Sequence, residues 1–182
     1  MLILASQSPR RRELLKLITE DFVATAADVD ETLPEGVRPD EAVQYLSKIK
    51  AAPFIKDGDT VIGADTVVSL DGIILGKPQD EQDAARMLRL LSGRCHSVFT
   101  GVTVATPEKS TTFCVETKVQ FFPLTDREIE SYVLTGEPLD KAGAYGIQGY
   151  GSLLVEKIDG DYFNVVGLPV SKLVRILSNF TL

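Results

Sequence analysis

The first half of the chain alternates between short apolar runs and segments with helical periodicity. Leu2–Ala5 is apolar throughout, which is typical of a buried strand. Ser8 and Pro9 follow as an N-cap and a first-turn proline, so we expect a helix to begin there. The same criteria predict a strand at Phe22–Ala26, a loop at Asp28–Pro39, a helix at Asp40–Ala52 and a strand at Val61–Val68.

The second half carries the signals of long antiparallel hairpins. Asp71-Gly72 predicts a tight turn into a strand at Ile73–Leu75. Long strands are predicted at His96–Thr106 and Ser110–Phe122, the second with alternating apolar positions. The remaining segments are predicted as helices at Asp80–Leu91, Thr125–Thr135 (with Thr125 and Glu128 as a capping box) and Pro169–Leu177, a glycine-rich loop at Glu137–Gly151, and strands at Leu153–Ile158 and Phe163–Val166. Because strand–helix units are mixed with hairpins, we expect an α/β fold, a single three-layer domain over residues 1–182 whose twisted mixed β-sheet is flanked by helices.

Composition and charge narrow the range of functions. The 182 residues are 44% hydrophobic and 25% charged, as in soluble globular proteins, which excludes a disordered or collagen-like chain. The formal net charge of −7 disfavours nucleic acid polymers and anionic membranes, so an anionic substrate would need a local group of basic residues, a bound cation, or both. No segment approaches the ~20 apolar residues of a membrane span, and no secretory signal is present. We expect a cytoplasmic protein, with Cys95 and Cys114 as buried thiols rather than a disulfide.

The predicted turn from the first strand into the first helix is a candidate anion site. Free backbone N–H groups at a helix start favour an anion, and the hydroxyl of Ser8 and the neighbouring arginines could add charge-assisted hydrogen bonds to phosphate. Successive helical residues point about 100° apart, so Arg10, Arg11 and Arg12 cannot all face one ligand. From this turn alone, phosphate binding and an ordinary N-cap followed by solvated arginines are equally open.

Asp65 is an acidic residue inside an otherwise apolar strand. A buried carboxylate there would be unfavourable unless it is paired or bound to a metal ion. The small residues Gly63 and Ala64 just before it leave space for a ligand to approach. Asp65 could therefore bind a divalent cation, polarise a water molecule, or both. The alternative is an aspartate at a strand edge that caps a neighbouring turn.

Four further residues have both a functional and a structural interpretation. Lys77, in a Gly-Lys-Pro turn, and Lys50, on the second predicted helix, suit phosphate but are equally compatible with solvated lysines. Glu31 is a metal ligand or a solvated loop acid. The amide of Gln148, in the glycine-rich loop, can pair with N3–H and O4 of uracil or thymine, or lie in solvent.

Other reaction classes lack their motifs. His96 is the single histidine and begins a predicted strand, so we interpret it as a surface or satisfied core residue. The sequence contains no nucleophile elbow, no zinc-binding His/Cys spacing, no P-loop and no dinucleotide fingerprint. Serine hydrolases, conventional kinases, GTPases and dehydrogenases are therefore disfavoured.

Several motifs extend in a fixed order over nearly the whole chain. They are LASQSPRR at Leu4–Arg11, IGADTV at Ile62–Val67, GKP at Gly76–Pro78, LSG at Leu91–Gly93, EPLDKAGAYGIQG at Glu137–Gly149 and NVVGLP at Asn164–Pro169. Together they resemble the Maf family of nucleoside triphosphate pyrophosphatases. The resemblance implies a Maf/ITPase-like fold and hydrolysis of a nucleoside triphosphate to the monophosphate and pyrophosphate. The SPRR, GADT and YGIQG motifs are similar to those of the branch that acts on dTTP and UTP rather than on 7-methyl-GTP.

The resemblance also implies roles for individual residues. Asp65 matches the proton acceptor, and Arg10, Thr66 and Gln148 match positions linked to base preference. Further active-site and substrate-binding positions that follow from the residue chemistry and the resemblance together are Ser8, Arg11, Glu31, Lys50 and Lys77. In the implied mechanism, the cationic residues and Ser8 hold the triphosphate, while Glu31 and Asp65 position Mg²⁺ or Mn²⁺.

The resemblance leaves some questions open. Gln7 stands where glycine is common in the family, and Cys95 where threonine is common. A homodimer is expected on the same ground, and modified pyrimidine nucleotides are further candidate substrates. The family's association with septum formation keeps a second function class open, a nucleotide-binding division regulator without significant turnover.

Overall fold

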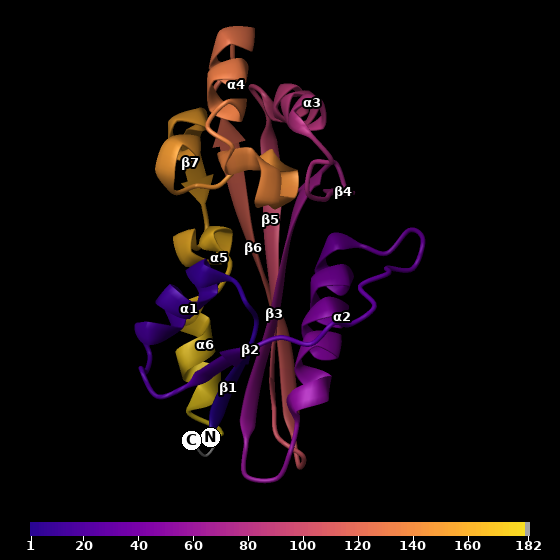
Figure 1. Ribbon diagram of the computed structural model, residues 1–182, viewed down its shortest axis with the longest axis vertical. Helices are drawn as coiled ribbons and strands as arrows, with labels where there is room; N and C mark the ends of the chain where they lie inside the picture. Colours follow the sequence, from indigo (N-terminus) through magenta and orange to yellow (C-terminus); the bar gives the residue numbers. More distant parts are fainter. Residues whose placement is uncertain (181–182) are drawn as a thin grey trace.

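The computed structural model describes residues 1–180, and one twisted seven-stranded sheet runs along its length (Figure 1). The strand order is β2-β1-β3-β5-β6-β7, and β4 pairs with the end of β3. β1 is parallel to β2 and β3, whereas the other pairs are antiparallel. The strands are β1 Leu2–Ala5, β2 Val23–Thr25, β3 Thr60–Leu70, β4 Ile73–Leu75, β5 Cys95–Ala105, β6 Ser110–Phe121 and β7 Val155–Asp159.

Helices cover both faces of this sheet and one of its ends. In Figure 1, α2 lies along one face, α1, α5 and α6 lie along the other, and α3 and α4 lie at the upper end. The helices are α1 Pro9–Lys16, α2 Pro39–Ala51, α3 Glu81–Leu91, α4 Asp126–Val133, α5 Tyr162–Val166 and α6 Val170–Leu177. Short 3₁₀ segments are η1 Ala52–Phe54, η2 Glu137–Asp140, η3 Ala142–Ala144 and η4 Gly149–Leu154. The predicted three-layer α/β fold with a mixed sheet is confirmed.

Local capping explains both the successes and one error of the sequence prediction. Ser8 caps α1 by accepting from the N–H of Arg11, and Thr125 and Glu128 form the predicted capping box of α4. The segment Phe163–Val166, predicted as a strand, is instead part of α5. The Asp161 carboxylate accepts from the first free N–H groups of this turn, and such a cap favours a helix over a strand in a short apolar run.

The close packing of α2 on β3 positions one side chain of the site. A Cβ atom on Gly63 would lie 2.2 Å from the carbonyl oxygen of Ser47, so the helix backbone rests directly on the strand. The Ser47 hydroxyl also lies 2.8 Å from that of Thr103 on β5. These contacts fix the height of α2 above the sheet and hence the place from which Lys50 extends.

Two large hydrophobic clusters occupy opposite ends of the sheet. One joins α3 and α4 to the sheet through Leu88, Leu91, Phe121 and Ile129, and the other packs under α1 and α6. Cys95 is exposed and Cys114 is half-buried, so the predicted burial of both thiols is wrong for Cys95, which lies at the start of β5. Within residues 1–180, every helix is too short or too polar to span a bilayer.

Candidate active site

A gap along one edge of β3 creates the main cleft. β1 stops at Ala5, which pairs with Gly63, and β4 joins the same edge only from Val68 onward. Within the described chain, Asp65 and Thr66 therefore have a neighbouring strand on the β5 side alone. A cleft of about 530 Å³ opens at this gap. Because β1 stops beside the longer β3, residues on both faces of β3 can be reached from the cleft.

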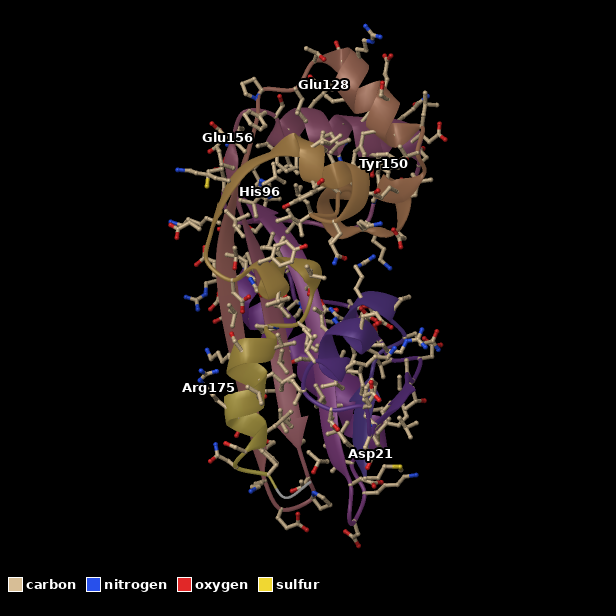
Figure 2. The ribbon with its side chains drawn as sticks, turned by 90° about the vertical axis from the view of Figure 1, so that its left-hand side faces the viewer. Asp21, His96, Glu128, Tyr150, Glu156 and Arg175 are labelled. Atoms are coloured by element: carbon tan, nitrogen blue, oxygen red, sulfur yellow. The ribbon has the colours of Figure 1, made fainter. Side chains whose placement is uncertain are left out.

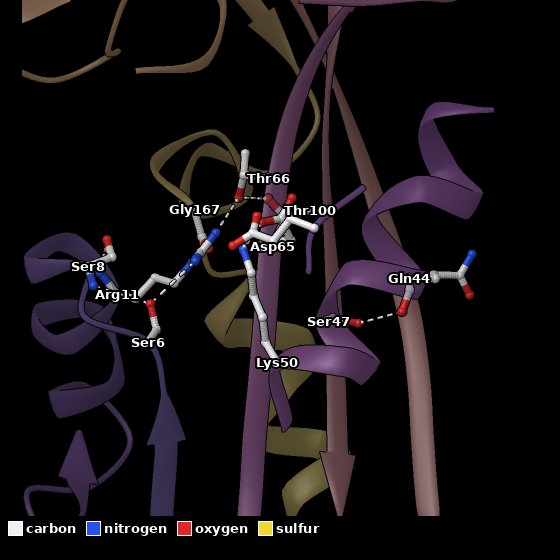
Figure 3. A network of polar contacts seen from close by, with 11 residues as sticks. Ser6, Ser8, Arg11, Gln44, Ser47, Lys50, Asp65, Thr66, Thr100 and Gly167 are labelled. Carbon is white, nitrogen blue, oxygen red and sulfur yellow. Dashed lines mark hydrogen bonds and ion pairs between the residues drawn. The ribbon is translucent and has the colours of Figure 1, made fainter. Parts of the chain in front are cut away.

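Asp65 and Lys50 form an ion pair on the α2 side of the gap. Asp65 shares its strand face with Gly63, against which α2 packs. The Lys50 ammonium donates to Asp65 Oδ1 at 2.5 Å, and Figure 3 shows the two side chains meeting beside β3. Glu31 Oε2 lies 3.1 Å from the same ammonium. Two carboxylates from distant segments thus converge on one cation.

Arg11 lies on the other side of β3, and its orientation is fixed by three acceptors. Its Nε donates to the carbonyl of Gly167 at 2.9 Å, Nη1 to Ser6 Oγ at 3.4 Å and Nη2 to Thr66 Oγ1 at 3.0 Å (Figure 3). Burial lowers the pKa of Arg11, and the nearby charge of Asp65 opposes this shift. A guanidinium has five N–H donors, so two remain for an anionic ligand in the cleft.

The Thr66 hydroxyl belongs to a directed chain of hydrogen bonds. It accepts from Arg11 and lies 2.9 Å from the hydroxyl of Thr100. Thr100 donates its single hydroxyl proton to the carbonyl of Asn164 at 3.0 Å. In the hydrogen bond between the two threonines, Thr66 is therefore the donor and Thr100 the acceptor. Thr66, which the resemblance links to base preference, therefore also holds Arg11 in place.

All nine side chains singled out from the sequence line this one cleft. Ser8, as N-cap of α1, and Arg10 lie at the helix start, whereas Lys77 and Gln148 are exposed and make no side-chain hydrogen bond within residues 1–180. Arg12 faces away and bonds the carbonyl of Gln7, as the helical spacing predicted. The nine residues are Ser8, Arg10, Arg11, Glu31, Lys50, Asp65, Thr66, Lys77 and Gln148.

A second cavity continues the cleft past the start of α1. It measures about 350 Å³. The residues that line both cavities are Ser8, Arg10, Arg11, Glu31, Lys50, Lys77 and Asp140. Beyond these residues it reaches Gln7 and the backbone near Ala26 and Ala27. Four cationic side chains and two carboxylates thus lie where the two cavities meet, and the excess of positive charge favours an extended anion at this junction.

Some lining residues were not identified from the sequence. Glu137 and Tyr145 lie within the EPLDKAGAYGIQG motif but carried no role, because their contacts are long-range. The Tyr145 hydroxyl lies 2.7 Å from His96 Nε2, and burial lowers the pKa of His96 to about 4. His96 is a core residue, and its Nδ1 has no hydrogen-bond partner within residues 1–180. The available signal for Glu137 was an acidic residue at the start of a segment rich in glycine and small residues, a signal that Asp140 in the same segment shares.

The carboxylate pair fits a divalent cation. Glu31 and Asp65 already approach one positive charge, the Lys50 ammonium, and hard oxygen ligands are those that Mg²⁺ and Mn²⁺ prefer. No group of three or more His, Cys, Asp or Glu residues that could hold a metal ion occurs among residues 1–180. A cation here would therefore use these two carboxylates and take its other ligands from phosphate oxygens and water.

Known proteins similar to this chain share its full length. The sequence profile of the family described as Maf-like protein matches residues 1–180. A protein from Bacillus pumilus named dTTP/UTP pyrophosphatase is 53% identical over 98% of this chain and 96% of its own length. A Bacillus velezensis protein of the same name is 51% identical over 100% and 97%. Among solved structures, a HAM1 protein from Coxiella burnetii covers 98% of both chains with a TM-score of 0.53 at 14% identity, a likeness of fold alone.

Proposed function

This chain belongs to the Maf family, as its motifs predicted, and on that premise we propose that it hydrolyses dTTP and UTP to the nucleoside monophosphate and pyrophosphate. One observation carries the proposal. Asp65, with Lys50 and Glu31 beside it, faces a cleft whose other walls hold Arg11, Lys77 and the remaining residues of the site. The cations can stabilise the charge that develops on the phosphate groups, and the carboxylate can take a proton from the attacking water.

The triphosphate binds at the junction of the two cavities. Arg11 directs its two remaining N–H groups to the phosphate oxygens, and the start of α1 adds backbone N–H groups beside Ser8. Lys77, which is exposed and unpaired within the described residues, closes the opposite side as a point charge. These cations offset the charge of the substrate on a protein whose net charge is −7.

Asp65 serves as the general base. Its carboxylate accepts a proton from a water molecule as the water oxygen attacks the α-phosphorus, and the bond between the α-phosphorus and the bridging oxygen breaks to release pyrophosphate. Lys50 orients the Asp65 carboxylate through the 2.5 Å ion pair. Glu31 and Asp65 would hold the divalent cation. When bound, Mg²⁺ or Mn²⁺ neutralises phosphate charge.

The pyrimidine ring of the substrate lies toward Gln148. Val68, Val98 and Val165 form an apolar wall on this side of the cleft, against which a planar ring can pack. The Gln148 amide offers both an acceptor and a donor, which match N3–H and O4 of uracil and thymine. Thr66 acts on base preference indirectly, because its hydroxyl is committed to Arg11 and Thr100.

Pyrophosphate release from a panel of nucleoside triphosphates, with and without Mg²⁺ or Mn²⁺, tests the proposal. We expect dTTP and UTP to be hydrolysed in preference to CTP, ATP and GTP, and only with the divalent cation. Modified pyrimidine triphosphates belong in the panel as further candidate substrates. Tight binding of UTP without product would instead favour a nucleotide-binding division regulator.

Subunit association is a separate question. The homodimer expected from the resemblance stays a prediction, and light scattering coupled to size exclusion measures it directly. Activity that is independent of protein concentration across the dissociation range would indicate that one chain holds a complete site, as the cleft suggests.

A further inference from the structure

Gln148 is carried by a tight turn, Gly146–Gly151, which we call the base turn. The Gln148 side chain is exposed and makes no hydrogen bond within residues 1–180. Its position therefore depends on what holds the backbone on either side of it. In Figure 2, Tyr150 at the end of this turn lies in the same part of the molecule as His96 and Glu128, far from Asp21 and Arg175.

The Glu137 carboxylate holds the far end of the base turn. Oε2 accepts from the N–H of Tyr150 at 3.1 Å, and Oε1 accepts from the N–H of Gly151 at 3.0 Å. Oε1 also accepts from the Tyr132 hydroxyl at 2.9 Å. Hydrogen bonds from backbone N–H groups to a charged carboxylate are stronger than those between neutral groups, so this is a firm anchor.

Tyr132 connects the same carboxylate to the near end of the turn. Its hydroxyl accepts from the N–H of Gly146 at 3.2 Å while donating to Glu137. The two ends of the turn also touch, because a Cβ on Gly151 would lie only 2.0 Å from the carbonyl oxygen of Gly146. Glu137 and Tyr132 thus close the turn on both sides of Gln148.

We propose that Glu137 is a positioning residue for base discrimination, because it holds the base turn, and with it Gln148, in one place on the cleft wall. This rests on the proposed function. A glutamine amide turned by 180° presents the reverse donor and acceptor order, which suits cytosine. The flip itself needs only rotation about the last side-chain bond, so the turn acts by fixing where the Gln148 backbone stands relative to the edge of the ring. A loosened turn weakens the pairing with uracil and so lowers the preference for uracil over cytosine.

The charge and position of Glu137 favour this role over direct binding. Both carboxylate oxygens are engaged by donors from its own chain. A free carboxylate would also repel the triphosphate. Glu137 sits at the start of η2 and its backbone carbonyl accepts from Lys141, so a change in its side chain leaves that contact in place.

The test compares Glu137→Ala, Glu137→Gln and the matched control Glu130→Gln, an exposed acid on α4. The readout is the ratio of kcat/KM for UTP over CTP, together with equilibrium binding of UMP over CMP. We expect Glu137→Ala to lower both ratios by about tenfold, since it removes three hydrogen bonds to a charged acceptor. Glu137→Gln keeps one oxygen acceptor and should lower them by about threefold. Glu130→Gln should leave them unchanged.

Two further measurements separate positioning from general damage. The inhibition constant of inorganic tripolyphosphate, which has no base, should change by less than about twofold in all variants. Tyr132→Phe should lower the ratios less than Glu137→Ala, and the double variant should be little worse than Glu137→Ala because the two residues act on one turn.

An unchanged UMP over CMP ratio in Glu137→Ala overturns the inference, as does an equal loss for both bases. Equal affinity of the unaltered protein for UMP and CMP overturns it as well. By contrast, absence of pyrophosphate release with intact preference for UMP overturns the proposed function alone.

Discussion

Two walls of one cleft are built in different ways. The wall that carries Asp65, Lys50, Thr66 and Arg11, the reaction wall, stands on β3, α2 and α1. Asp65 is 9% exposed, its partner Lys50 is placed by the packing of α2 on β3, and Arg11 is held by the hydroxyls of Thr66 and Thr100. The opposite wall is the base turn, which includes only the start of the short 3₁₀ segment η4 and is held by contacts from the side chains of Glu137 and Tyr132.

The difference teaches where rigidity is needed. Proton transfer and attack at phosphorus depend on sub-ångström placement, which regular elements supply. Reading a base requires only that one amide be presented in one orientation. We therefore expect changes on the reaction wall to abolish turnover or destabilise the fold, and changes at the base turn to alter selectivity.

Among changes to the reaction wall, we expect Asp65→Asn to have the largest effect on turnover. The amide keeps the size of the carboxylate but cannot take a proton from water, so we expect kcat to fall by about 10³-fold, equivalent to about 4 kcal/mol. Circular dichroism and the melting temperature should show a folded protein, because Lys50 retains Glu31 as a partner.

Asp71→Asn is the matched control. Asp71 follows β3, pairs with Arg94 and lies outside the cleft, so its variant should keep full turnover. Substantial activity in Asp65→Asn would remove Asp65 as the base and leave orientation by the cations as the source of catalysis.

Gly63→Ala disturbs the packing of α2 on β3 and leaves the chemical groups of the reaction wall unchanged. The added Cβ would meet the Ser47 carbonyl at 2.2 Å, and the helix backbone must move away. We expect a loss of about 3 kcal/mol in the free energy of unfolding and a displaced Lys50. Urea denaturation measures the loss. Gly76→Ala, where a Cβ meets nothing within 4 Å, should have little effect, and equal stability of both variants would contradict the packing argument.

The fold was largely predictable because its signals are local. The apolar run at β1, the Ser8 cap and the long alternating strands each depend on neighbouring residues. The error at Phe163–Val166 is also local in origin, since so short a run of mostly apolar residues suits either a strand or a capped helical turn. The Asp161 cap decides between them, and it was not recognised.

The sequence predicted nine side chains that line the cleft, but not the contacts between them. Motifs identified Asp65, Lys50 and Gln148, yet spacing could not indicate that Lys50 bridges Asp65 and Glu31. The role of Thr66 as an acceptor for Arg11 depends on where β1 stops against β3. Such contacts follow from strand register and helix packing, which a single sequence does not specify.

Acid pH should weaken the support of the base turn. His96 bonds Tyr145, one residue before this turn, and burial lowers the pKa of His96 from 6.5 to about 4. Between these values the unfolded chain binds a proton that the folded protein excludes, so the free energy of unfolding falls as the pH drops. We expect His96 to contribute about 3 kcal/mol to this loss by pH 4.

His96→Phe isolates that contribution, because the ring keeps its packing against Phe121 but cannot titrate. The variant is expected to be less stable at neutral pH, since the Tyr145 hydroxyl loses its partner, yet to lose less stability between pH 6.5 and 4. Parallel curves of unfolding free energy against pH for the two proteins would rule out His96 as the source.

Gln148→Ala should have the smallest effect of these variants. It also separates the two walls most clearly, because it should change KM and leave kcat and stability nearly unchanged. The exposed amide contributes nothing to folding within the described residues, so the melting temperature should not change. Removing one pair of hydrogen bonds to the base should raise the KM for UTP by about tenfold while kcat changes little, because Asp65 and Lys50 are untouched. Steady-state kinetics with UTP and CTP measure this, with inhibition by tripolyphosphate as the control for the phosphate side. If kcat fell instead, the base turn would be helping to place the α-phosphorus, and the two walls would not act separately.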